Sequence, residues 1–170
     1  ADALYSDVPW LGMQIADIAQ LDRVLVIGST LRKDHPLLAH RLRQAAKKQL
    51  QINLLNPVDD DLLMRVANKA IVAPSRLAVA LAQVTKAVAQ AKGAALPADV
   101  RLAIDGLAIG EPAKRIADSL VSGEHAGVFL GHLAQHHAAA AQLHALAQVL
   151  SCHNLSGRYD ITGIGAGNFI

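Results

Sequence analysis

The stretch VLVIGSTLRKDHP, residues 24–36, is the most informative part of this chain about its fold class. Four consecutive apolar residues run directly into Gly28, and a charged loop then leads to His35-Pro36. Continuous rather than alternating hydrophobicity is typical of a parallel strand that is covered on both faces. Proline is favoured in the first turn of a helix and the residue before it avoids helical geometry, so a helix is predicted from Pro36. Strand, glycine, loop and helix in this order open many nucleotide-binding folds, which raises the question of a ligand.

Predicted strands and helices alternate along the rest of the chain. Strands are expected at residues 23–27, 51–56, 70–73 and 126–131. Helices are expected at residues 36–48, 75–93, 111–123 and 137–152. Ser75 is predicted to cap the second of these helices and Gly93 to end it. We therefore expect a three-layer α/β fold, Rossmann-like, with a mostly parallel sheet and helices on both of its faces.

Length and composition favour a single domain over residues 1–170. Apolar residues make up 52% of the chain and aromatic residues only 3%, so we expect a core of aliphatic side chains. The Gly-rich stretch 156–170 is expected to form a loosely ordered tail. The chain starts without Met and without a signal peptide, which we interpret as the start of a fragment of a longer subunit.

Charge and cysteine content argue against several classes of function. The net charge is +2, with 16 basic and 14 acidic residues, which is too balanced to predict binding to nucleic acid or to an anionic membrane. The apolar stretches fall far short of the ~18 residues of a membrane-spanning helix, so no direct membrane insertion is expected. The single cysteine, Cys152, excludes an internal disulfide and is typical of a reducing compartment.

Ligands of such sheets bind beyond the carboxyl ends of the strands, here the loops 29–35 and 56–61. Neither loop carries the G-x-G-x-x-G fingerprint of a dinucleotide site, and the chain has no P-loop motif. Asn56-Pro57 stands where an acid would hold a ribose, and the aspartates 59–61 would repel a phosphate. A bound dinucleotide is therefore not predicted. The alternative is a small nucleotide- or pterin-binding module whose pocket is lined by Ser29, Thr30, Asn56 and Asp59.

A histidine-rich stretch follows the fourth predicted strand. His132 and His136 have an i, i+4 spacing, which places two imidazoles on one face of a helix. With Cys152 as a third ligand they would form a metal site for zinc, although the chain shows no recognised spacing of zinc ligands. Structural or surface histidines are the other interpretation, and both remain open at this point.

Basic residues gather on the first predicted helix and just before it. These six residues are Arg32, Lys33, Arg41, Arg43, Lys47 and Lys48. Two interpretations remain open for them: a solvated helix face and a surface that binds a protein partner.

Three longer stretches resemble a known family. They are VLVIGSTLRKDHPLLAHRLRQAAKK, INLLNPVDDDLLMRVANKAIVAPS and GVFLGHLAQHHAAAAQLHALAQVL. Together they resemble the C-terminal region of the G subunit of bacterial NADH-quinone oxidoreductase, respiratory complex I, which belongs to the molybdopterin oxidoreductase superfamily. The resemblance covers about residues 10–153, and residues 28–43 are its most specific part, because His35-Pro36 matches the pair that opens a helix in the superfamily.

The chain departs from the cofactor-binding members of the superfamily at two places. Their second strand normally ends in an Asp-Pro-Arg type of loop that contacts the pterin, whereas this chain has Asn56-Pro57-Val58. Thr30 stands where an asparagine is common in those members. The resemblance therefore implies that the fold is kept and the molybdenum cofactor is lost.

The resemblance also implies a function for the parent protein. Complex I passes electrons from NADH to quinone through iron–sulfur clusters, and the cysteines that bind clusters lie in the N-terminal part of the G subunit. With one cysteine, this fragment is expected to hold no cluster and no other cofactor. We expect a non-catalytic structural domain that contacts other subunits or domains of the peripheral arm, on the cytoplasmic side of the bacterial inner membrane.

Overall fold

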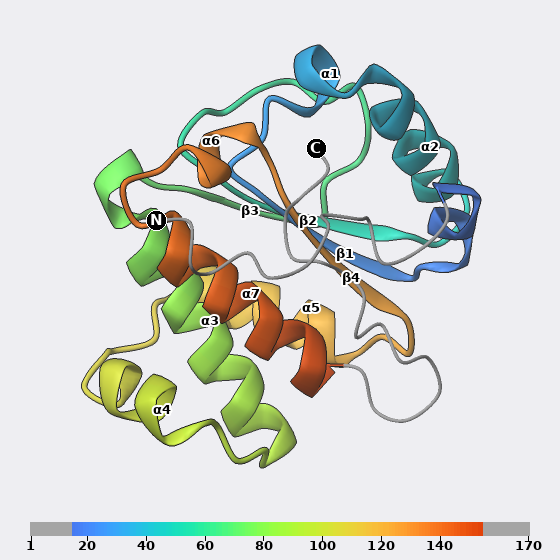
Figure 1. Ribbon diagram of the computed structural model, residues 1–170. Coiled ribbons are helices and arrows are strands. Elements are labelled where there is room, and N and C mark those ends of the chain that lie inside the picture. The colour runs from blue at the N-terminus through green and yellow to red at the C-terminus, as the bar shows by residue number, and fades with distance from the viewer. Residues whose placement is uncertain (1–14, 155–170) are drawn as a thin grey trace.

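The computed structural model describes residues 15–154, which form a four-stranded sheet between two layers of helices (Figure 1). The strands are β1 (Arg23–Ile27), β2 (Gln51–Asn56), β3 (Asn68–Ile71) and β4 (Ala126–Leu130). Neighbouring strands are all parallel, and their order is β3-β2-β1-β4. The predicted α/β fold with a mostly parallel sheet is confirmed.

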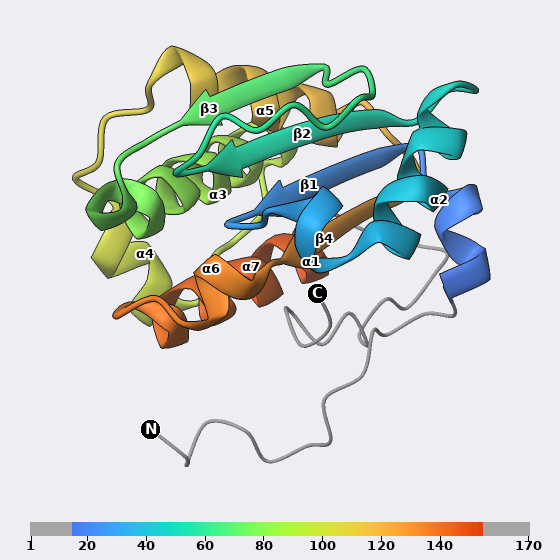
Figure 2. The same ribbon diagram turned by 90° about the horizontal axis from the view of Figure 1, so that it is seen from above.

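Helices cover both faces of this sheet, as Figures 1 and 2 show from two directions. One face carries η2 (Ile15–Gln20), α1 (Leu31–Asp34) and α2 (Pro36–Ala46). The other face carries α3 (Leu77–Lys92), α5 (Glu111–Val121) and α7 (Ala140–Asn154). Shorter helical segments lie between these elements: η3 (Pro74–Arg76), α4 (Ala98–Ile104) and α6 (His132–Gln135).

Successive residues of β1 face opposite layers of the molecule. Leu25 and Ile27 pack with α3, α5 and α7, whereas Val24 and Val26 pack with η2 and α2. All four side chains are fully buried, which is why the strand is apolar at consecutive positions. Burial of one such side chain contributes about 1.5–3 kcal/mol, so β1 anchors both helical layers to the sheet. Phe129 is the one aromatic residue in the two clusters, and the predicted aliphatic core is confirmed.

A polar network crosses the middle of the sheet at Asn53 of β2. This side chain is fully buried, and its Nδ2 donates to the Val24 carbonyl oxygen at 3.2 Å and to Ser119 Oγ at 3.1 Å. Its Oδ1 accepts a hydrogen bond from Asn68 Nδ2 at 2.8 Å. Because these partners lie on β1, α5 and β3, one buried amide links three strands and a helix, with both of its ends satisfied.

Helix α3 ends as predicted and begins differently. Gly93 follows it with φ 61, a left-handed conformation that glycine adopts without a steric penalty. The predicted Ser75 cap is wrong, because Pro74 opens a separate 3₁₀ turn that contains Ser75. Helix α3 itself starts at Leu77, with Arg76 at the N-cap position and no side-chain hydrogen bond to the helix start.

The third strand and the last helix are shifted along the chain from their predicted positions. The strand β3 begins at Asn68 and not at residue 70, because its pairing with β2 starts opposite Asn53. The helix α7 begins three residues after the predicted start at His137, because the Nδ1 atom of that histidine accepts a hydrogen bond from the Ala139 N–H at 2.9 Å. This side-chain hydrogen bond thus moves the start of α7 about one turn toward the C-terminus.

The predicted tail at residues 156–170 lies outside the described part of the chain. Among the helices of residues 15–154, none combines the length and the apolarity that a membrane span requires. The single domain predicted over residues 1–170 stays a prediction beyond the described residues.

Candidate functional site

The strand order reverses beside β1, and this reversal defines where a ligand of the fold would bind. From β1 the chain moves to β2 and β3 on one side, and it returns at β4 on the other side. In open α/β sheets the ligand crevice lies at the carboxyl ends of the two strands that flank such a reversal. Here these ends are Gly28 after β1 and Gly131 after β4. The sequence pointed to the loops after β1 and β2, so it missed Gly131.

Protein backbone fills this reversal point. A Cβ atom on Gly28 would lie 2.7 Å from the Ala134 backbone nitrogen, and Gly28 has a left-handed φ of 59. A Cβ atom on Gly131 would lie 2.3 Å from Ser29 Cβ. The Ala134 N–H also donates to the Gly28 carbonyl oxygen at 3.2 Å. The two glycines therefore let the start of α6 approach the end of β1, where a ligand would otherwise lie.

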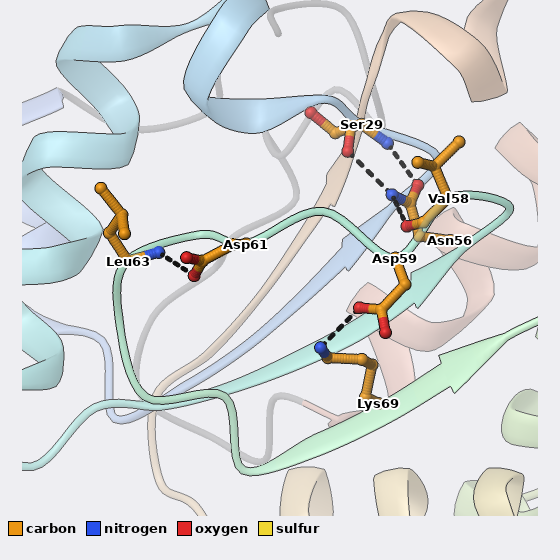
Figure 3. Close-up of polar contacts among 7 residues, drawn as sticks. All are labelled: Ser29, Asn56, Val58, Asp59, Asp61, Leu63 and Lys69. Atoms are coloured by element: carbon orange, nitrogen blue, oxygen red, sulfur yellow. Dashed lines mark hydrogen bonds and ion pairs between the residues drawn. The ribbon is translucent and has the colours of Figure 1, made fainter.

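Asn56, at the end of β2, is bonded entirely within the protein (Figure 3). Its Oδ1 accepts a hydrogen bond from the Ser29 N–H at 2.9 Å, and its Nδ2 donates to the Ser29 carbonyl oxygen at 3.0 Å. The same Nδ2 donates to the Val58 carbonyl oxygen at 2.8 Å. The side chain is 1% exposed, so both amide ends stabilise the loops after β1 and β2 rather than facing a crevice.

Thr30 is occupied by a contact within its own loop. Its hydroxyl donates to Asp34 Oδ2, and its N–H donates to the same oxygen at 3.3 Å. The hydroxyl bond is the main reason that the pKa of Asp34 lies below its usual range, and slight burial acts in the opposite direction. The Thr30 N–H and the positive charges of His35 and His132 lower this pKa further. Thr30 and Asp34 thus form a local hydrogen-bonded pair that spans α1.

Ser29 is the one predicted pocket residue whose hydroxyl is left unbonded. Its side chain is fully buried, and its Oγ has no hydrogen-bond partner within the described residues. An orphaned buried hydroxyl is uncommon and sometimes marks a ligand site. Here the Ser29 Cβ lies against Gly131, so the hydroxyl is enclosed by protein.

Two of the three aspartates after β2, Asp59 and Asp61, also bond within the chain, whereas the buried Oδ2 of Asp60 has no hydrogen-bond partner in the described residues. Asp59 Oδ1 lies 2.6 Å from Lys69 Nζ, and Asp61 Oδ1 accepts a hydrogen bond from the Leu63 N–H at 2.9 Å (Figure 3). The Asp61 carbonyl oxygen accepts a hydrogen bond from Arg32 Nη1 at 2.6 Å. These contacts fasten the loop between β2 and β3 to β3 on one side and to α1 on the other.

The groups at this edge do not fit a pterin. Such a ring is held by several donors and acceptors that converge on an open crevice. Asn56 and Thr30 already use their polar groups internally, and Asp59 is ion-paired. Ser29 has an unused hydroxyl but no exposed surface.

The proposed zinc ligands are brought together only in part. The rings of His132 and His136 have centroids 4.0 Å apart and planes tilted by 39°, and both residues are exposed. Cys152 lies near the end of α7, about 18 Å along the helix from its start at Ala140. Within residues 15–154 no group of three or more His, Cys, Asp or Glu residues is arranged to hold a metal ion.

Two cavities lie away from the strand ends. The first has a volume of about 310 Å³, and it is lined by Ala82 of α3, Ile104 of α4 and Leu146 of α7, among others. The second, of about 360 Å³, lies between the end of α3 and α4. Both are formed by helices on one face of the sheet, and neither includes a predicted site residue.

Fold and site together define a class: a parallel, doubly wound α/β domain whose ligand edge is closed by its own backbone and side chains. A family model of molybdopterin oxidoreductase matches residues 5–169, and the chain therefore belongs to the molybdopterin oxidoreductase family. This match confirms the superfamily that the three sequence stretches resemble. No curated protein matches the chain in a sequence search.

Proposed function

We propose that this chain is a non-catalytic structural domain of the G subunit of a bacterial NADH-quinone oxidoreductase. Membership of the molybdopterin oxidoreductase family supports an oxidoreductase-related module. The resemblance of residues 10–153 to the C-terminal region of that subunit supports the particular complex. Electron transfer from NADH to quinone would then take place at iron–sulfur clusters elsewhere in the parent complex.

The observation that carries the proposal is the internal bonding of Asn56. Asn56 stands at the strand end where relatives with a cofactor have an acid. Its side-chain amide bonds both the N–H and the carbonyl oxygen of Ser29, and it also donates to the carbonyl oxygen of Val58. A residue that holds two loops in this way supports a scaffold, because a ligand would have to break these bonds to use it. The close contacts at Gly28 and Gly131 support the same conclusion.

The proposal includes partners and a location. The domain would contact other subunits or domains of the peripheral arm, on the cytoplasmic side of the bacterial inner membrane, with no nucleic acid and no membrane insertion of its own. The iron–sulfur clusters would be bound by the N-terminal part of the parent subunit.

The test is purification of the native full-length protein through a tag placed on its gene. We expect it to co-purify with NADH-quinone reductase activity, and we expect less than about 0.1 pterin per chain after oxidative release of fluorescent pterin. Absence of that activity from the purified assembly would contradict the complex I assignment. One pterin per chain at this domain would contradict the scaffold role.

A second candidate is the small nucleotide- or pterin-binding module, and the orphaned Ser29 hydroxyl is the observation that favours it. Calorimetric titration of the full-length protein with NADH, with a nucleoside monophosphate and with pterin cofactor distinguishes the two. Micromolar binding that is lost in Ser29→Ala would establish this candidate. A heat of binding that Ser29→Ala leaves unchanged would show that the ligand binds at another site.

A further inference from the structure

The surface of α1 and α2 concentrates positive charge. It comprises Arg32, Lys33, Arg41, Arg43, Lys47 and Lys48, which we call the α1–α2 basic surface. These are six of the 16 basic residues of the chain, and the same segment contains a single acidic residue, Asp34. Since the chain as a whole has 14 acidic residues, the two signs of charge are separated here rather than mixed.

None of these six cations is ion-paired with a carboxylate of the described residues. The ion pair found in residues 15–154 joins Lys69 to Asp59, outside this surface. Arg32 donates to a backbone carbonyl oxygen, and Arg43 Nη2 lies 3.3 Å from His40 Nδ1. The carboxylate of Asp34 is bound by Thr30. No carboxylate of the described residues therefore lies within ion-pair distance of these six cations.

Helix α2 turns one complete face to the solvent. Leu38, Leu42 and Ala45 are buried on the opposite face, against the sheet. The exposed face runs from Leu37 through Arg41 and over the end of the helix to Lys48, about 16 Å along its axis. Leu37 lies on this exposed face and is itself 80% exposed.

A second exposed leucine lies on the neighbouring loop. Leu63 is 53% exposed and has a left-handed φ of 52, while the preceding Leu62 is buried in the same cluster as α2. The Arg32–Asp61 hydrogen bond ties this loop to α1. The α1–α2 basic surface is thus bordered by two apolar side chains, Leu37 and Leu63, on segments that pack on one cluster.

We propose that the α1–α2 basic surface is the docking site for an acidic protein surface. Unpaired cations around exposed leucines fit a partner that offers carboxylates around an apolar patch. A polyanion such as nucleic acid fits less well, because the net charge is only +2 and the aspartates 59–61 lie in the adjoining loop. The inference rests on the proposed function and deepens it, because it names the chemistry of the contact within the peripheral arm.

Lysine footprinting of the native assembly tests the inference. The tagged full-length protein is purified with its partners at low salt and acetylated with a membrane-impermeant reagent, and each lysine is quantified by mass spectrometry. We expect Lys47 and Lys48 to react at least about tenfold more slowly than Lys114, an exposed lysine of α5 on the other side of the sheet. Zero-length carbodiimide coupling should link Lys47 or Lys48 to an aspartate or glutamate of the partner.

Charge reversal of the surface is a second test, and it has a matched control. A variant with Arg41→Glu, Lys47→Glu and Lys48→Glu should lose about 90% or more of the co-purified partner. The control, Arg101→Glu with Lys114→Glu and Arg115→Glu, changes three exposed cations on α4 and α5 and should retain it. All six side chains are exposed, so both variants should unfold at the wild-type temperature within about 2 °C.

The outcomes separate the two proposals. Protected lysines in an assembly without NADH-quinone reductase activity would support the docking site and contradict the proposed function. Full labelling of Lys47 and Lys48 in an active complex, with normal assembly of the charge-reversed variant, would overturn the docking site alone. Binding of single-stranded DNA or of phosphatidylglycerol vesicles that this variant abolishes would also overturn the acidic protein partner.

Discussion

Two asparagines on one strand, Asn53 and Asn56, are both buried in β2 and bond different parts of the molecule. Asn53 sits in mid-sheet and bonds mostly to other side chains, Asn68 and Ser119. Asn56 sits at the carboxyl edge and bonds only backbone groups, at Ser29 and Val58.

The two asparagines differ in what their position in the sheet leads one to expect. In mid-sheet a polar side chain is expected to be structural, because no ligand reaches it. At the carboxyl edge the same residue type would ordinarily face a cofactor. Asn56 instead satisfies the backbone of the loop that would form the pocket. A polar residue at the carboxyl edge of the sheet is therefore not by itself a sign of ligand binding.

The largest loss of stability should come from adding a methyl group at Gly131, where the protein is closely packed at the carboxyl edge. In Gly131→Ala the new Cβ would lie 2.3 Å from Ser29 Cβ and 2.6 Å from the Gly28 carbonyl oxygen. Because backbone cannot move aside cheaply, we expect a loss of about 3 kcal/mol or more in the free energy of unfolding, measured by urea denaturation. Gly106→Ala is the control, since its Cβ would meet nothing within 4 Å. Equal stability of the two variants would show that the edge is open.

Alanine at the two asparagines tests the comparison directly. Asn56→Ala leaves buried backbone groups of Ser29 unpaired, and we expect it to lower the free energy of unfolding by about 2–3 kcal/mol. Asn53→Ala should lose about 1–2 kcal/mol, because Ser119 keeps a hydrogen bond to Gln51 Oε1 at 3.1 Å. The reverse order, in the same denaturation series, would make the edge asparagine the dispensable one.

A smaller, pH-dependent effect is expected at the Thr30–Asp34 pair. The pKa of Asp34 is lowered in the folded protein from its ordinary 3.8, so its ionised form stabilises the fold above pH 3.8. That stabilisation is lost as pH falls through the lowered pKa. Thr30→Val should remove most of this stabilisation by ionised Asp34. The free energy of unfolding of the variant should therefore fall less steeply than that of the wild type below pH 3.8. Parallel curves, and an unchanged Asp34 titration by NMR, would rule out the Thr30–Asp34 hydrogen bond.

The smallest effect should come from the orphaned hydroxyl. Ser29→Ala removes a buried oxygen that has no partner in the described residues, so unfolding free energy should stay within about 0.5 kcal/mol of wild type or rise. Thermal unfolding without and with added pterin or nucleotide measures this. A loss above about 1 kcal/mol would mean that the hydroxyl has an unseen hydrogen-bond partner. If added pterin or nucleotide stabilises the wild type and not the variant, that ligand is the partner.

Local signals were sufficient for most of the elements. The apolar run of β1, the proline that opens α2 and the glycine that ends α3 each act within a few residues, so their positions could be predicted. Ser75 failed as a cap because the preceding proline started a separate turn. The shift of β3 to Asn68 depended on pairing with a strand about 15 residues earlier, which local periodicity does not report.

Ser29, Thr30 and Asn56 could be placed at the carboxyl edge from sequence, since each follows or ends a predicted strand. Their bonding partners could not be predicted. Asn56 reaches 27 residues back to Ser29, and nothing in either segment alone distinguishes this contact from an empty pocket. The pairing of β4 with β1 joins segments about 100 residues apart, and it alone identified Gly131 as part of the edge.

The α/β class, the alternation of elements and the lack of a dinucleotide fingerprint followed from the sequence alone, because hydrophobic period and turn chemistry act locally. That protein groups occupy the carboxyl edge became apparent only from the packing of the described residues. Closure depends on the backbone of α6 meeting that of β1 at Gly28 and on an amide bonding a distant loop. Such contacts join segments that are far apart in the chain, so no local sequence pattern reports them.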